Sequence, residues 1–185
     1  LIVAPKVESA AMVHALSRDL RPGVALWAMI ETPRALIDLR DIAEADGALR
    51  GLMLGVNDLA KALKTGAAPD REPLKPWLAA VVAHARANGL TAIDGVFNRI
   101  KDDAGFAAEC AQGRVYGFDG KSLIHPSQID EANAAFGPSD EELAWARGVV
   151  AAFAAPEAAG KGAIRLDGAM VERLHLAEAE RLLAY

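Results

Sequence analysis

Short apolar runs alternate along the chain with longer segments in which apolar residues recur every three or four positions. The runs cover residues 1–4, 24–30, 52–56, 91–93 and 118–124. The first three are almost continuously apolar, which is typical of parallel strands covered on both faces. Between the runs, the helical period covers residues 8–20, 33–46, 58–65, 72–88 and 102–113. This alternation predicts repeated βα units built on a parallel sheet.

A polar cluster follows each apolar run, at residues 5–8, 31–33, 57–58, 94–95 and 125–126. Barrels and open doubly wound sheets place their active sites at the carboxyl ends of the strands. Helix capping is the alternative explanation, with Thr32 and Asp58 as N-caps. Five successive clusters favour a shared functional rim. The five strands are three fewer than the eight of a closed barrel.

The C-terminal part of the chain has a different pattern. Helices are predicted at residues 127–135, 139–153 and 170–184, and residues 155–162 are typical of a flexible linker. We therefore divide the chain into a partial barrel, residues 1–136, and a helical extension, residues 137–185. Leu1 lies directly in an apolar run, so we expect further barrel strands to precede it.

The composition excludes several classes of protein. A content of 52% hydrophobic and 24% charged residues is that of a globular protein with a core. The net charge of −5 and the scattered Lys and Arg residues argue against nucleic-acid binding. Every apolar run is shorter than the roughly 18–20 residues of a membrane span, so no membrane contact is expected. The single cysteine, Cys110, excludes an internal disulfide framework and favours a cytoplasmic location.

Glu31 and Asp58 form the strongest candidate site. Each carboxylate follows an apolar run almost directly, so both are expected at the same rim. Two hard oxygen ligands, with room for water and substrate oxygens, suit Mg²⁺. Capping and ordinary ion pairing remain the alternatives.

Five segments resemble a known family. In chain order, APKVES, AMIETPRAL, GLMLGVNDLA, AIDGVF and GFDGKSLIHPSQI resemble the strand-end motifs of the citrate lyase β-subunit/malyl-CoA lyase family, within the HpcH/HpaI aldolase–citrate lyase superfamily. The resemblance implies an α/β fold, a (β/α)₈ TIM barrel of the phosphoenolpyruvate/pyruvate-binding type, which forms homotrimers or hexamers. It places the metal carboxylates at Glu31 and Asp58, with Glu31 also at the substrate.

The chemistry that the resemblance implies is reversible cleavage of a β-hydroxyacyl-CoA thioester, such as malyl-, citramalyl- or citryl-CoA. Mg²⁺ would act as the Lewis acid, and a general acid would protonate the thioester enolate. Asp94 is a candidate for the pocket wall. Ile124 and His125 are expected at the substrate, because the family's IHP segment borders the coenzyme A channel. Lys121 is either a contact to a CoA phosphate or, more commonly for a lysine, solvated.

The tail departs from the family at one position. Members carry a motif resembling D-G-x-M-I-D, whose last Asp reaches a neighbouring subunit's active site as the acid. Residues 167–172 read DGAMVE, so Glu172 is the catalytic candidate here, with Asp167 as the fallback. Alternatively, Glu172 only begins the last helix, where a negative charge suits the helix dipole.

Two other functions stay open. One is a class II pyruvate aldolase acting on free hydroxy-keto acids, and the other is a non-catalytic CoA-binding homologue that has lost the acid. The IHPSQ segment and the tail motif favour the CoA branch. The family's substrate-binding arginine and much of its CoA site come from early strands outside these 185 residues, so the particular thioester stays open.

Overall fold

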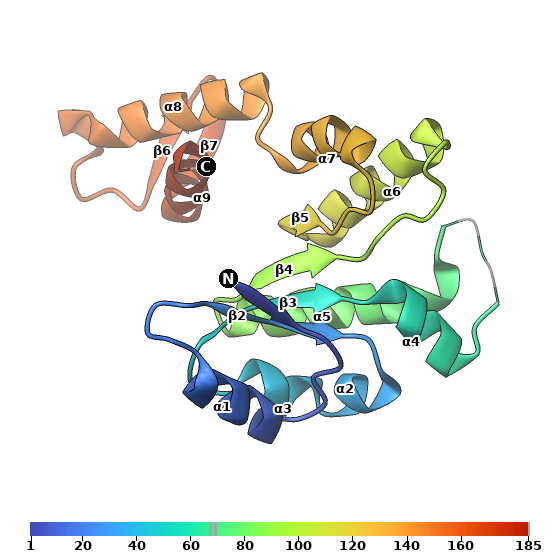
Figure 1. Ribbon diagram of the computed structural model, residues 1–185. Helices are drawn as coiled ribbons and strands as arrows, with labels where there is room; N and C mark the ends of the chain where they lie inside the picture. Colours follow the sequence, from blue (N-terminus) through green and yellow to red (C-terminus); the bar gives the residue numbers. More distant parts are fainter. Residues whose placement is uncertain (67, 69, 185) are drawn as a thin grey trace. The chain divides into compact units, whose positions relative to one another are not determined.

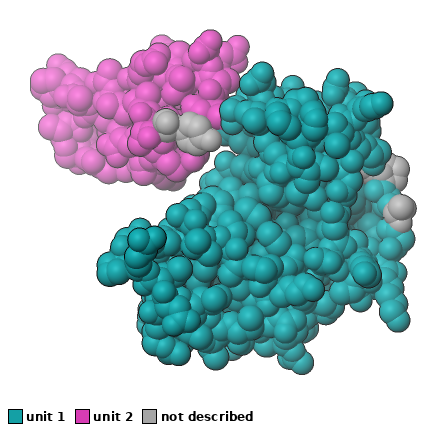
Figure 2. Space-filling view, viewed as in Figure 1, with its two compact units in different colours: residues 1–136 teal, residues 137–185 magenta. Residues whose placement is uncertain are grey.

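The computed structural model of the chain describes residues 1–66, 68 and 70–184. The chain forms two compact units, Leu1–Phe136 and Gly137–Tyr185 (Figure 2). Each unit buries its own cluster of apolar side chains. Each unit is therefore described by itself.

The first unit is built on a parallel sheet whose strands lie side by side in chain order (Figure 1). The strands are β1 (Ile2–Ala4), β2 (Leu26–Ile30), β3 (Leu49–Leu54), β4 (Thr91–Asp94) and β5 (Gly120–Lys121). Each strand pairs in parallel with the next one along the chain. This order, with a helical crossover after each strand, is that of a segment of a βα barrel.

Helices connect the strands and pack against the sheet and one another (Figure 1). They are α1 (Ala10–Asp19), α2 (Pro33–Ile37), α3 (Leu39–Ala43), α4 (Val56–Leu63), η1 (Glu72–Leu74), α5 (Lys75–Ala87), α6 (Asp103–Tyr116), η2 (Pro126–Gln128) and α7 (Ile129–Phe136). The βα pattern predicted from the sequence is thus confirmed. One expected helix, residues 33–46, is divided at Asp38, which ends α2 and precedes α3.

The two faces of the sheet differ in burial. In β2, Leu26, Ala28 and Ile30 are fully buried, whereas Trp27 and Met29 are half-buried. Because side chains alternate along a strand, the buried residues share the face that packs against the helices. The other face is the one that points inward in a closed barrel. The expectation that both faces are fully covered is therefore not met within the described chain.

The second unit contains a β-hairpin between two helices. Its elements are α8 (Asp140–Ala154), η3 (Pro156–Ala158), β6 (Ala163–Leu166), β7 (Ala169–Glu172) and α9 (Arg173–Leu183). The expected helix at residues 170–184 is wrong at its start, because β7 occupies those residues and α9 begins only at Arg173. The segment expected as a flexible linker carries η3, whose Ala158 is buried.

The hairpin has a local physical cause. Asp167 and Gly168 form its two-residue turn, and both have left-handed backbone angles, with φ of +50° and +83°. Asp-Gly is a preferred pair for this kind of turn, since its two central positions require positive φ.

Among the described residues, no helix is both long and apolar enough to cross a membrane.

Candidate active site

Glu31 is the first residue after β2, and its side chain is only 5% exposed. The backbone N–H of Lys6 donates a hydrogen bond of 2.8 Å to Glu31 Oε1. Lys6 has a left-handed backbone, with φ of +50°, in the turn that follows β1. The turns after β1 and β2 are therefore joined at this carboxylate, as expected for strand ends that share one rim.

Gly55, which follows β3, leaves the space that Glu31 occupies. A Cβ at Gly55 would lie 2.4 Å from Glu31 Cβ and 2.6 Å from Glu31 Oε2, closer than such atoms can approach. The N–H of Gly55 also donates to the carbonyl oxygen of Ile30 at 2.9 Å. Only glycine fits here without displacing the carboxylate.

Asp58 is the third residue of α4 and is exposed. The N-cap of α4 is Gly55, without a side-chain capping bond, so capping by Asp58 is wrong. Thr32 is a cap as predicted, because its hydroxyl accepts a 3.1 Å hydrogen bond from Ala35 N–H. Asp58 therefore does not cap α4, and its exposed side chain interacts with the Glu31 carboxyl group.

The two carboxylates influence one another. Burial raises the pKa of the Glu31 carboxyl, and the charge and hydrogen bonding of Asp58 raise it further, against the opposing effect of the Lys6 N–H. Two neighbouring carboxylates repel one another when both are charged, so binding of a proton or a cation by the pair is favoured. Within the described ranges no group of three or more His, Cys, Asp or Glu side chains could hold a metal. A hard divalent cation that keeps several water or substrate ligands fits a site with two carboxylates.

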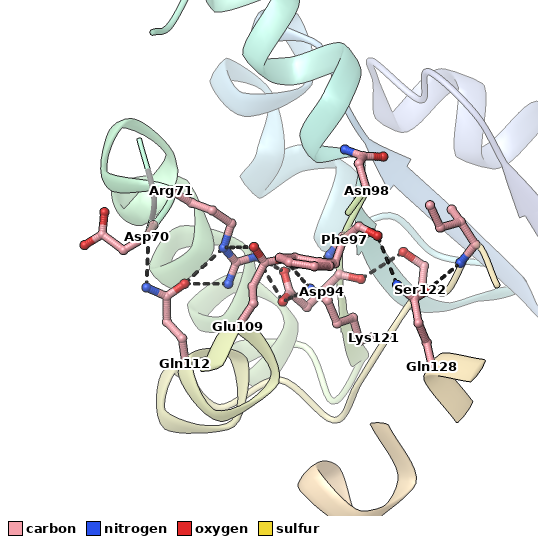
Figure 3. Close-up of polar contacts among 12 residues, drawn as sticks. Asp70, Arg71, Asp94, Phe97, Asn98, Glu109, Gln112, Lys121, Ser122 and Gln128 are labelled. Carbon is pink, nitrogen blue, oxygen red and sulfur yellow. Dashed lines mark hydrogen bonds and ion pairs between the residues drawn. The ribbon is translucent and has the colours of Figure 1, made fainter. Parts of the chain in front are cut away.

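A second cluster lies on the helix-covered side of the sheet (Figure 3). Asp94, at the end of β4, is fully buried. Its carboxylate accepts hydrogen bonds from Arg71 Nη1 at 2.8 and 3.0 Å, and from Lys121 Nζ at 2.8 Å. Lys121 Nζ also lies 2.7 Å from Glu109 Oε1, and Arg71 Nε lies 3.5 Å from Glu109 Oε2. We call these four residues the buried quartet, although the side chain of Glu109 is 11% exposed.

The quartet changes the interpretation of two predicted residues. The side chain of Lys121 is 0% exposed, so the expected solvated lysine is wrong. Asp94 has no exposed atom with which to contact a ligand. Strand alternation explains why: Asp94 shares its face with the buried Ala92 and pairs in register with Lys121. A substrate contact by Asp94 stays a prediction without support from this burial.

Arg71 and Glu109 were not anticipated from the sequence. Arg71 precedes η1, and Glu109 lies in the middle of α6. Gln112, one helical turn after Glu109, accepts from Arg71 Nε and Nη2 at 3.0 and 2.6 Å. The sequence does show that Glu109 and Gln112 share one face of a predicted helix, because residues three apart lie on the same face. That face is the one that binds Arg71.

Ile124 and His125 both lie on the exposed loop after β5. His125 Nδ1 accepts from Ser127 N–H at 3.2 Å, so the imidazole caps η2. The buried Gln128 fixes the loop, because its Oε1 accepts from Ile124 N–H at 3.1 Å and its Nε2 donates to Phe97 O at 3.1 Å (Figure 3). Both predicted residues are therefore accessible on a well-anchored loop.

Glu172 belongs to the second unit, where it ends β7 and is the N-cap of α9. Its N–H donates to His175 Nδ1 at 2.8 Å. Glu172 therefore directly precedes the last helix and caps it. A role as a catalytic acid is compatible with this position and stays a prediction. Asp167 lies in the hairpin turn.

A parallel βα barrel segment with two carboxylates near its strand-end rim is shared by a broad class of proteins, among them many metal-assisted enzymes. The comparisons with known proteins narrow the class. The HpcH/HpaI aldolase/citrate lyase family matches residues 1–126, and the chain belongs to this family.

Two relatives of known name match almost the whole of this chain. The chain is 46% identical to the (3S)-malyl-CoA thioesterase of Cereibacter sphaeroides (strain ATCC 17025 / ATH 2.4.3), over all of this chain and 64% of that relative. It is 34% identical to the citrate lyase subunit beta of Leuconostoc mesenteroides subsp. cremoris, over 99% of this chain and 64% of the relative. The chain thus spans a little under two-thirds of the length of these relatives.

A solved structure confirms the predicted barrel fold class. The protein CitE from Mycobacterium tuberculosis, in complex with magnesium, acetoacetate and coenzyme A, matches with a TM-score of 0.76 and 34% identity. The match covers 98% of this chain and 66% of that chain. The predicted family is confirmed as well.

Proposed function

We propose that this chain is the larger part of a Mg²⁺-dependent enzyme acting on a malyl-CoA-type thioester. The observation that carries the proposal is the Glu31–Asp58 pair at the strand-end rim of a chain in this family. Magnesium in the related M. tuberculosis structure supports Mg²⁺ as the cation. The predicted Mg²⁺ site and the acyl-CoA substrate are both parts of this proposal.

Glu31 and Asp58 would hold the cation, which when bound supplies Lewis-acid stabilisation of charge that develops on substrate oxygens. Lys6 N–H and Gly55 fix the orientation of Glu31, so that little rearrangement is needed on binding. Ile124 and His125, on the loop after β5, would line the side of the site that receives the CoA moiety.

We propose thioester hydrolysis as the reaction. Water adds its oxygen to the thioester carbonyl, the carbon–sulfur bond breaks, and the CoA sulfur takes up a proton, giving malate and free CoA. The 46% identity to a malyl-CoA thioesterase over the whole chain favours this reaction.

Carbon–carbon cleavage is the second candidate, favoured by the 34% identity to a citrate lyase β-subunit. The hydroxyl group of the substrate loses its proton, the bond between the hydroxyl-bearing carbon and the CH₂ breaks, and the thioester enolate takes up a proton. The products of malyl-CoA would then be glyoxylate and acetyl-CoA. This was the reaction expected from the sequence. For either reaction Glu172 is our candidate proton donor, acting on a neighbouring subunit's site.

The test uses malyl-CoA and the full-length protein. A thiol reagent detects free CoA, and a hydrazine reagent detects glyoxylate in the same sample. Thiol without glyoxylate supports hydrolysis, and glyoxylate without thiol supports the lyase reaction. Glu31→Gln and Asp58→Asn should abolish either signal and weaken Mg²⁺ binding in calorimetry. Unchanged Mg²⁺ affinity in both variants would contradict the metal assignment.

A further inference from the structure

Both the carboxylate and the carbonyl oxygen of Asp94, at the end of β4, accept several hydrogen bonds. Besides its bonds to Arg71 and Lys121, Asp94 Oδ1 accepts from Gly95 N–H at 2.7 Å. Its carbonyl oxygen accepts from Ser122 N–H at 2.9 Å and from Ser122 Oγ at 3.1 Å. The carboxylate therefore fixes Gly95 after β4 and the side chain of Lys121 on β5, and the carbonyl oxygen of the same residue holds the backbone after β5.

Gly95 packs against the end of β3 and the start of α4. A Cβ at Gly95 would lie 2.5 Å from Val56 Cγ1 and 2.8 Å from Leu54 O, so the two backbones are in close contact. Leu54 ends β3 and Val56 begins α4. Asp94 thus fixes the glycine that packs against the junction between β3 and α4.

The same β3–α4 junction also contacts Glu31 and carries Asp58, the two carboxylates of the candidate metal site. Between Leu54 and Val56 lies Gly55, which packs directly against the Glu31 carboxylate. Two residues beyond Val56, the first turn of α4 carries Asp58. A continuous series of contacts therefore leads from Asp94 through Gly95 and the β3–α4 junction to both carboxylates.

The four charged side chains of the quartet restrict how the segments that carry them can be arranged. Two carboxylates and two cations cancel, and within the described part of the chain every buried side-chain nitrogen and oxygen has a hydrogen-bond partner. Buried ion pairs contribute little to stability compared with apolar packing, but a wrongly placed buried charge is costly. Such a network permits few arrangements of the segments that it joins.

We propose that Asp94 is a positioning residue for the Glu31–Asp58 pair, acting through Gly95 and the β3–α4 junction. This inference rests on the proposed function of that pair in Mg²⁺ binding. It assigns Asp94 to the support of the site and not to contact with the substrate.

Asp119 provides a matched control for Asp94. It is also a strand-end aspartate bound to an arginine, with Asp119 Oδ1 2.7 Å from Arg86 Nη2, and it also accepts a backbone N–H, that of Ala92, at 2.8 Å. However, Asp119 precedes β5 and lies at the amino end of the sheet, away from the rim. Asp119→Asn should reduce stability without altering the metal pair.

The experiment measures two quantities in full-length protein. The first is amide hydrogen exchange of residues 54–58 without metal, and the second is Mg²⁺ affinity by calorimetry. Asp94→Asn should accelerate exchange in this segment and weaken Mg²⁺ binding about 10-fold, as for other supporting residues of metal sites. Asp119→Asn should change neither.

Gly95→Ala provides a second variant, which leaves all four quartet residues in place and displaces only the junction. It should reproduce the loss of Mg²⁺ affinity even if Asp94→Asn fails to fold. Wild-type Mg²⁺ affinity in Gly95→Ala would overturn the inference while leaving the proposed function intact. If Glu31→Gln and Asp58→Asn both bind Mg²⁺ as wild type does, the proposed function fails and the inference fails with it.

Discussion

Close packing around single residues determines the geometry of the carboxylate pair. Gly55 is required because Glu31 occupies the space of its missing side chain, and the Lys6 N–H fixes one carboxylate oxygen. The orientation of Glu31 is therefore set by backbone atoms of two neighbouring turns. Backbone contacts of this kind are insensitive to rotamer changes and suit a site that must be ordered before ligand binding.

Gly55→Ala tests this packing. The added methyl group must displace the Glu31 side chain or the β3–α4 backbone, and overpacking of this kind costs about 1–3 kcal/mol. We expect a lower free energy of unfolding in a denaturant titration, together with weaker Mg²⁺ binding in calorimetry. Gly66→Ala is the control, since a Cβ there would meet no atom within 4 Å. Equal Mg²⁺ affinity in both variants would refute the packing argument.

Glu31 also predicts a pH dependence of the metal-free protein. Its pKa is raised in the fold above 4.5, first by burial and then by Asp58. The folded state therefore binds this proton more tightly than the unfolded state does, and the resulting stability is present at low pH and lost as pH rises through the raised pKa. Glutamine has no carboxyl group to deprotonate, so the Glu31→Gln variant does not lose stability in this way as the pH rises. We expect the variant to have a higher Tm than wild type at pH 7 in EDTA, with the difference shrinking toward pH 4.

Residues at strand ends were the part of the site that the sequence could predict. Glu31 follows an apolar run directly and Asp58 follows one after a single residue, so a position of both near the rim is expected from the βα pattern. The partners of Asp94 could not be predicted in the same way, because Arg71 and Glu109 come from separate segments that meet only in the folded sheet. The face on which Asp94 lies depends on strand register, which one sequence does not fix.

At the scale of elements, the boundaries follow local signals wherever such signals are strong. Thr32-Pro33 starts α2, and Ser139 with Glu142 forms a capping box at α8. The hairpin of β6 and β7 was missed although its Asp-Gly turn is a strong hairpin signal. The helical period of the residues that follow extended the expected helix backward over β7. Turn chemistry was the better guide at that point.

Gly168→Ala tests the importance of this turn. Gly168 has a φ of +83° and open space around it, so alanine would be strained by the backbone angle alone. A left-handed residue with a side chain costs roughly 1–2 kcal/mol. Gly162→Ala, also in open space but without a positive φ, is the matched control. We expect limited proteolysis to cut the second unit faster in Gly168→Ala only. Equal cutting rates would show that the turn angle does not limit stability.

At the scale of the whole molecule, the candidate metal pair and the candidate acid belong to different compact units. We propose that the protein forms trimers or hexamers in which the acid of one subunit serves the metal of another. Light scattering that finds only monomers of full-length protein would contradict this assembly.

Complementation tests the shared site directly. Glu172→Ala should lower kcat by about 10²–10⁴-fold and leave Mg²⁺ affinity unchanged, as loss of a general acid does. Glu31→Gln should lose the metal instead. Mixed oligomers of the two variants contain some sites with an intact metal pair and an intact acid, so activity should return above that of either variant alone. No return of activity in demonstrably mixed oligomers would exclude a shared site.

The buried quartet has a consequence for how such sequences change over time. Loss of Asp94 alone leaves Lys121 and Arg71 with one carboxylate between them, and breaking a buried pair in this way costs about 3–5 kcal/mol. Replacing Asp94 together with Lys121 by apolar residues removes one charge of each sign and avoids that cost. Stability therefore favours compensating pairs of substitutions at these positions, so that a related sequence that lacks Asp94 is expected to lack Lys121 as well.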